Sequence, residues 1–167
     1  MTSVNVKLGD IGPQWTTACK QAVSDLNDLF KRKGVDVTLS ASGASGPTIS
    51  VSTDPGILGT AVHGKTSAET TGAGKLLGAK VRLPVKVVIN SPKGIRDAGP
   101  GILEVIVAHE LVHALGQAVH NSHLMGQTMT KSLGDSPAGD KLQTGAIKMP
   151  PLQLAQETVD ALKSIWN

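Results

Sequence analysis

The chain has 167 residues, of which 40% are hydrophobic and 17% are charged, and its formal net charge is +3. This length and composition exclude a disordered chain, and they predict a single globular domain over residues 1–167. The lysines are scattered and the aromatic side chains number only two tryptophans and one phenylalanine, which argues against a nucleic-acid-binding surface.

The N-terminal part of the chain predicts a strand, a long helix and two further strands. Residues 3–8 alternate weakly between apolar and polar side chains, as a short strand does. Pro13 opens a helix whose apolar residues follow one face, and Gly34 stands just past its end. Residues 35–39 and 49–51 alternate in the same manner and predict two more strands.

The middle of the chain predicts a loop, a strand and a buried helix. Residues 56–78 are rich in glycine and threonine and predict an extended loop, with short strands as the alternative. Residues 79–89 alternate again, but Pro84 interrupts them, so we expect an edge strand or a bent strand rather than a central one. Residues 101–115 are apolar almost all round, which indicates a helix in the middle of the domain, ended by Gly116.

The C-terminal part predicts a long loop and a last helix. Residues 117–149 have no clear period, and a loop of this length is often functional. The pair Pro150-Pro151 is predicted to open a helix with an apolar stripe. The predicted fold class is therefore α+β, in which a twisted mixed sheet is combined with an N-terminal helix, a central helix and a C-terminal helix.

The central helix carries the motif His109-Glu110-Leu111-Val112-His113. His109 and His113 lie one turn apart on one face, which lets two imidazoles bind one zinc ion. Glu110 lies on the flank of that face, where it can reach a water molecule on the metal without binding the metal. A chance match is the alternative, but such polar groups inside an apolar helix are costly unless something satisfies them. We therefore predict that the cofactor is Zn²⁺.

Residues 109–125 resemble the active-site segment of the metzincin metalloproteases, and among these most closely that of small bacterial matrixin-like proteins. The family pattern is His-Glu-x-x-His-x-x-Gly-x-x-His, followed by a methionine in a tight turn. The residues that match it position by position are His109, Glu110, His113 and Gly116. Met125 stands where this Met-turn is expected. Outside residues 109–125 the resemblance rests on the order of the elements and not on motifs.

The third histidine of the family pattern is displaced in this chain. The pattern places it at Val119, whereas His120 follows one residue later. A one-residue bulge after Gly116 would still present His120 to the metal, and we favour it as the third ligand. His123 is the alternative, although it stands only two residues before Met125. The histidine that does not bind is then an exposed loop residue or a neighbour of a ligand.

The resemblance implies a zinc-dependent metalloendopeptidase that hydrolyses peptide bonds in a peptide or protein substrate. Zinc would lower the pKa of a bound water molecule toward about 7. Glu110 would take the proton of that water and pass it to the leaving amine. By the same analogy, residues 79–89 would hold the substrate in extended form, and residues 126–149 would form the wall of the pocket.

Two other interpretations stay open. The first is a zinc-binding structural or binding protein of metzincin fold with little protease activity. If His120 and His123 both bound zinc, its site would be four-coordinate and closed. The second is a hydrolase that cleaves the peptide crosslinks of a cell wall.

Two isolated residues are given structural roles. Cys19 is the only cysteine, so no disulfide within the chain is expected, and its place on the apolar side of a helix indicates a buried, inert thiol. His63 is read as an ordinary loop histidine, with a contact to a second ion or to the substrate as the alternative.

No signal peptide and no membrane-spanning stretch is visible in the sequence. We therefore expect a monomer without a membrane or nucleic-acid partner, either cytoplasmic or released by a non-standard route. No inhibitory prosegment is visible, which implies another restraint on an active enzyme, such as its compartment, an unidentified inhibitor or partner protein, or narrow specificity.

Overall fold

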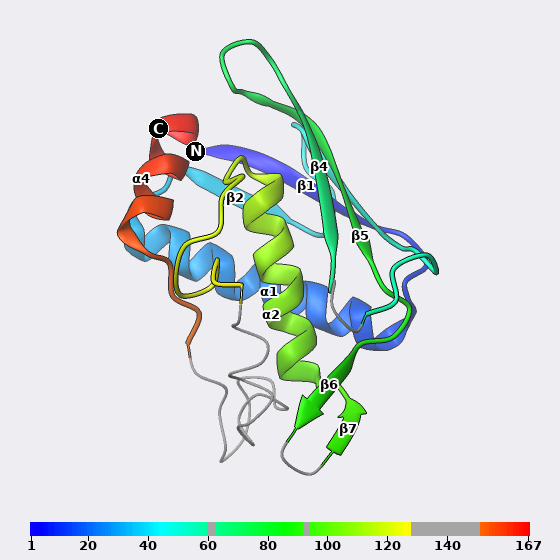
Figure 1. The fold of residues 1–167 in the computed structure, drawn as a ribbon. Helices are drawn as coiled ribbons and strands as arrows, with labels where there is room; N and C mark the ends of the chain where they lie inside the picture. The colour runs from blue at the N-terminus through cyan, green and yellow to red at the C-terminus, as the bar shows by residue number, and fades with distance from the viewer. Residues whose placement is uncertain (60–62, 92–93, 128–150) are drawn as a thin grey trace.

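The computed structural model describes residues 1–59, 63–91, 94–127 and 151–167. The described elements are, in chain order, β1 (Thr2–Leu8), α1 (Gly12–Lys33), β2 (Val37–Ser40), β3 (Thr48–Thr53), β4 (Lys65–Thr70), β5 (Leu76–Leu83), β6 (Val88–Ser91), β7 (Gly94–Asp97), α2 (Pro100–Ala114) and α4 (Gln156–Trp166). The fold class is α+β, as predicted, with a mixed sheet and three helices in these parts of the chain (Figure 1).

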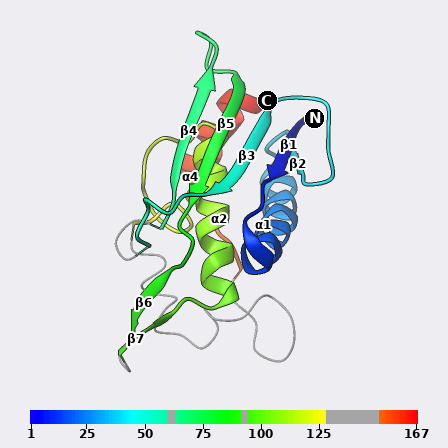
Figure 2. The ribbon, with the colours of Figure 1, turned by 90° about the vertical axis from the view of Figure 1, so that its right-hand side faces the viewer.

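The main sheet has five strands in the order β2-β1-β3-β5-β4. The first four of these strands are parallel to their neighbours, and β4 pairs antiparallel with β5 at one edge. The inner strands bury alternate side chains such as Val6, Ile49 and Val81, whereas Lys7 and Lys80 point to solvent. Figure 2 shows α1 and α2 together behind the sheet, so one face of the sheet is covered by helices. The strands β6 and β7 form a separate hairpin.

The two long helices form as the sequence predicts. Pro13 lies in the first turn of α1, and Gly34 ends the helix in a left-handed conformation with φ 68°. The helix α2 is buried along nearly its whole length and packs against α1, β4 and β5. None of the helices in the described ranges is long and apolar enough to cross a membrane.

The prediction of an edge or bent strand over residues 79–89 is wrong. The strand β5 begins earlier, at Leu76, and lies between β3 and β4, so it is central. The edge strand is β4, inside the segment for which short strands were only the alternative. Pro84 follows the last residue of β5 instead of interrupting the strand, and its carbonyl accepts a hydrogen bond from Trp15 Nε1 at 2.9 Å.

The last helix begins later than predicted, at Gln156 rather than at Pro150-Pro151. The residues before it are extended, with Leu152 and Leu154 buried, and Leu154 forms an antiparallel bridge with His123. A strand-like contact therefore takes the place of the first predicted helical turns. Residues 117–127 are irregular, as predicted, and the remainder of the predicted loop lies outside the described residues, including nearly all of the predicted pocket wall 126–149.

Candidate metal centre

Three histidine side chains meet beside the C-terminal end of α2, and we call them the histidine cluster: His109, His113 and His120. The Nε2 atoms of His109 and His113 are 3.0 Å apart. The Nε2 atom of His120 lies 3.2 Å from each of them. His109 and His113 are partly buried and His120 is exposed, so the cluster opens to solvent on the side of His120.

The end of α2 brings His120 back to the helix. Gly116 has a φ of 116°, which turns the chain away from the helix axis. Its N–H donates to the carbonyl of His113 at 3.0 Å, and the N–H of Gln117 donates to the carbonyl of Val112 at 3.3 Å. The chain then reverses, so that His120 enters the cluster and Val119, at 62% exposure, does not.

The ring orientation of the two helical histidines is set by backbone carbonyls. The Nδ1 atom of His109 lies 2.8 Å from the carbonyl oxygen of Leu124, and the Nδ1 atom of His113 contacts the carbonyl oxygen of Gln117. Because a carbonyl only accepts hydrogen bonds, Nδ1 carries the proton in both rings. The Nε2 atom of each neutral ring therefore directs a lone pair into the cluster.

Burial keeps His109 neutral, because it lowers the pKa of this imidazole to about 4. The pKa of His120 is lowered as well, by its partial desolvation and then by the neighbouring charge of His113. Neutral imidazole is the form that binds a metal ion, so these environments favour metal binding over protonation.

The spacing of the three nitrogen atoms fits a metal ion. Tetrahedral zinc with Zn–N distances of 2.0–2.1 Å separates its ligand nitrogens by about 3.3 Å, close to the 3.0–3.2 Å between the Nε2 atoms of the cluster. Within the described residues, this is the only group of three or more histidine, cysteine or acidic side chains with ligand atoms near enough to share an ion.

Glu110 lies next to the cluster and is held by the edge strand. Its side chain is 7% exposed, and its Oε2 atom accepts a short hydrogen bond from the hydroxyl of Thr66 on β4. A Cβ atom at Gly64 would lie 2.8 Å from Oε1 of Glu110, so only glycine fits there unless the carboxylate shifts. Burial raises the pKa of Glu110, while the Thr66 hydrogen bond and the charge of His113 act in the opposite direction.

A cavity of about 450 Å³ joins the cluster, the carboxylate and the edge strand. It is lined by Gly64, Lys65, Thr66, Ala68, Glu110, His113, Ala118 and His120. An acid–base group, two of the three clustered histidines and one side of β4 therefore border the same open space.

The structure leaves His123 outside the cluster. This residue is exposed, has a φ of 56° and lies in the turn from Ser122 to Gly126, where the N–H of Gly126 donates to its carbonyl at 3.0 Å. Met125 lies in the same tight turn and is fully buried. The turn contacts the cluster through Leu124, whose carbonyl orients His109.

Two other residues from the sequence lie elsewhere. Cys19 is buried in α1, and burial raises the pKa of its thiol to about 12, as expected of an inert cysteine. His63 precedes Gly64 and does not belong to the histidine cluster. Its Nε2 atom is enclosed without a hydrogen-bond partner among the described residues, and burial lowers its pKa.

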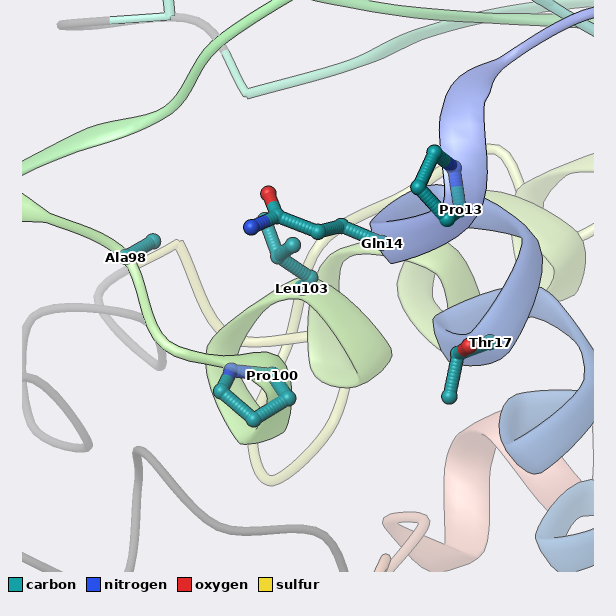
Figure 3. Close-up of a pocket in the computed structure, with 6 residues that line it drawn as sticks. All are labelled: Pro13, Gln14, Thr17, Ala98, Pro100 and Leu103. Atoms are coloured by element: carbon teal, nitrogen blue, oxygen red, sulfur yellow. The ribbon is translucent and has the colours of Figure 1, made fainter.

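A second cavity, of about 320 Å³, lies between the first turns of α1 and α2. It is lined by Pro13, Gln14, Thr17, Ala98, Pro100 and Leu103 (Figure 3). None of these side chains is an acid, a base or a metal ligand, so this cavity offers no group for acid–base or metal chemistry.

Several groups at the site were not predicted from the sequence, namely Gly64, Thr66, Gln117 and the carbonyl of Leu124. Thr66 belongs to a segment whose composition indicates a loop, and the carbonyl contacts carry no residue-type signal. Comparison of the chain with models of known protein families and with curated proteins finds no match.

Proposed function

We propose that this chain is a zinc-dependent endopeptidase of metzincin type, in which His109, His113 and His120 hold the metal. One observation carries the proposal. Both helical histidines are fixed with the proton on Nδ1, and their Nε2 atoms approach each other to 3.0 Å. Two converging lone pairs repel each other, and a bound cation converts this repulsion into coordination.

The described ligand set supports a catalytic site more than a closed one. Three protein ligands are typical of catalytic zinc, whereas structural zinc has four. When bound in such a site, zinc activates a water molecule and polarises a carbonyl group. His123 is outside the cluster, which argues against the closed four-histidine site of a purely structural or binding protein.

Glu110 is the residue that we assign as general base. Its raised pKa suits a group that accepts a proton and later returns it to a leaving amine. The Thr66 hydroxyl holds Oε2, so we assign the proton transfer to Oε1. Its place beside His113 in the same cavity supports this role.

The edge strand β4 is our candidate for substrate binding. Among the described strands, β4 pairs with β5 on one side only, and its residues Lys65, Thr66 and Ala68 line the cavity. An extended peptide can add to such an edge through main-chain hydrogen bonds. This assignment replaces residues 79–89, because β5 has neighbours on both sides.

The test is the zinc content of the purified protein together with cleavage of a peptide library, for the wild type and for Glu110→Gln. We expect stoichiometric zinc in both proteins and a loss of about 10²- to 10⁴-fold in kcat/KM in the variant. The matched control is Glu157→Gln, which removes an exposed carboxylate from α4. Full cleavage by Glu110→Gln would exclude the mechanism, and a wild type that binds no zinc would exclude the proposed function.

The same assay separates the competing functions. A wild type that holds zinc and cleaves no peptide or protein would be a zinc-binding protein without protease activity. If that protein instead released crosslinked stem peptides from purified cell walls, the cell-wall hydrolase would replace the endopeptidase.

A further inference from the structure

We infer that the segment from Gln153 to Thr158 positions the histidine cluster, and that Thr158 is a positioning residue that sets its metal affinity. This inference rests on the proposed function. Thr158 lies in the first turn of α4, far from α2 in the sequence, and its side chain contains none of the proposed ligand atoms.

The Thr158 hydroxyl is a buried acceptor shared by two amides. Thr158 is 0% exposed, and its Oγ1 atom accepts hydrogen bonds from Gln117 Nε2 at 3.1 Å and from Asn121 Nδ2 at 2.7 Å. Gln117 is itself only 5% exposed. A buried amide that loses its acceptor costs about 1–3 kcal/mol, so the loop between these residues is held firmly.

Both residues bound to Thr158 adjoin proposed ligands. The carbonyl of Gln117 accepts the Nδ1 hydrogen bond of His113. Asn121 is the chain neighbour of His120. The hydroxyl of Thr158 therefore acts on the second and third histidines of the cluster through one residue each.

The first histidine is linked to the same segment through the backbone. The carbonyl of Leu124 accepts the Nδ1 hydrogen bond of His109 at 2.8 Å. The N–H of the same residue donates to the carbonyl of Gln153 at 2.9 Å, next to the bridge between His123 and Leu154. The peptide unit that orients His109 is thus paired with the residues that lead into α4.

These contacts explain how a loop with one extra residue still presents a ligand. Val119 projects into solvent, and the loop has no apolar anchor at that position. The side chains of Gln117 and Asn121 fix the loop on both sides of it by binding one oxygen atom. Partners of this kind orient ligand imidazoles, and their loss typically weakens metal affinity about 10- to 100-fold.

The experiment measures the zinc affinity of the full chain by competition with a chromophoric chelator. We expect Thr158→Val, which keeps the shape and removes the acceptor, to bind zinc about 10- to 100-fold more weakly. Thr158→Ser keeps the oxygen and should stay within about threefold of the wild type. The neighbouring Val159→Ala removes buried packing without touching the hydrogen bonds, and it should leave the affinity close to that of the wild type.

Cobalt substitution gives a second readout that a merely structural role of Thr158 would not change. The visible absorption of bound Co²⁺ reports its coordination, and we expect it to change in Thr158→Val and not in Val159→Ala. A folded Thr158→Val with wild-type zinc affinity and an unchanged cobalt spectrum would overturn the inference.

Two further outcomes are decisive. If Thr158→Val does not fold, the exposed Asn121→Ala variant removes one of the two hydrogen bonds, and an unchanged zinc affinity in that variant also overturns the inference. If the wild type binds no zinc, the proposed function fails together with the inference. Zinc binding by the wild type and equal binding by all variants refute the positioning role alone.

Discussion

A buried pair of carboxyl groups joins the two long helices, and replacing Glu104 by glutamine tests whether one of them is protonated in the folded protein. Glu104 on α2 is 0% exposed. Both of its carboxyl oxygens, together with Oδ2 of Asp25 on α1, are buried and meet no hydrogen-bond partner among the described residues. A proton on Glu104 would supply the missing donor toward Asp25.

The expected effect on stability follows from the pKa. Burial, and then the hydrogen bond and negative charge of Asp25, raise the pKa of Glu104 from 4.5 to about 9. Because this pKa is raised on folding, the stabilisation is complete below pH 4.5 and is lost as the pH rises toward 9. Each pH unit in this range lowers the free energy of unfolding of the wild type by about 1.4 kcal/mol. The loss between pH 5 and pH 8 is then up to about 4 kcal/mol.

The assay is urea unfolding of the metal-free wild type and of Glu104→Gln between pH 5 and pH 8. His109 acts in the opposite direction, since its lowered pKa destabilises the folded protein as the pH falls, but both proteins contain it and the difference between them removes it. We expect the free energy of unfolding of Glu104→Gln to gain on the wild type as the pH rises. A constant difference between the two proteins over the whole range would show that Glu104 is not protonated on folding, and would refute the reasoning.

Two further substitutions test the surroundings of the site. Thr66→Val removes the hydrogen bond to Glu110 and keeps the branched shape, so we expect kcat/KM to fall about tenfold or more with full zinc content, while Thr70→Val at the exposed end of β4 serves as the control and equal losses in both would argue against a role for Thr66. Gly116→Ala places a Cβ 2.6 Å from Ile165 Cδ1 at a φ of 116°, so we expect thermal unfolding to show a loss of about 1–3 kcal/mol and weaker zinc binding. Its control is Gly43→Ala, where φ is 94° and no atom lies within 4 Å, and unchanged zinc affinity in Gly116→Ala would contradict this expectation.

The parts of the fold that are periodic in the sequence could be predicted, and the edge of the sheet could not. The helix α2 is recognisable because it is apolar all round, and the strands β1 and β3 because they bury alternate residues. The strand β4 is exposed at almost every position, so burial leaves no alternation in its sequence. The next strand, β5, was misplaced at the edge because Pro84 was counted as an internal residue, whereas it follows the end of the strand.

The candidate site shows the same division. The spacing of His109 and His113 follows from the helical repeat alone. The contact between Thr66 and Glu110 joins residues 44 positions apart, and that between Gln117 and Thr158 joins residues 41 positions apart. Pairings of this range depend on how sheet and helices pack, and a single sequence contains no local pattern that records them.

The displaced third histidine shows why spacing alone identifies ligands on a helix more safely than ligands in a loop. On α2 each residue advances by a fixed angle, so an insertion would rotate His113 off the face of His109. After Gly116 the chain is constrained only at certain points, where Gln117 and Asn121 bind Thr158. An additional residue between two such points can be accommodated by an outward bulge, as the exposed Val119 indicates. The choice between His120 and His123 therefore depends on hydrogen bonds to the C-terminal segment, and not on the count of residues after the glycine.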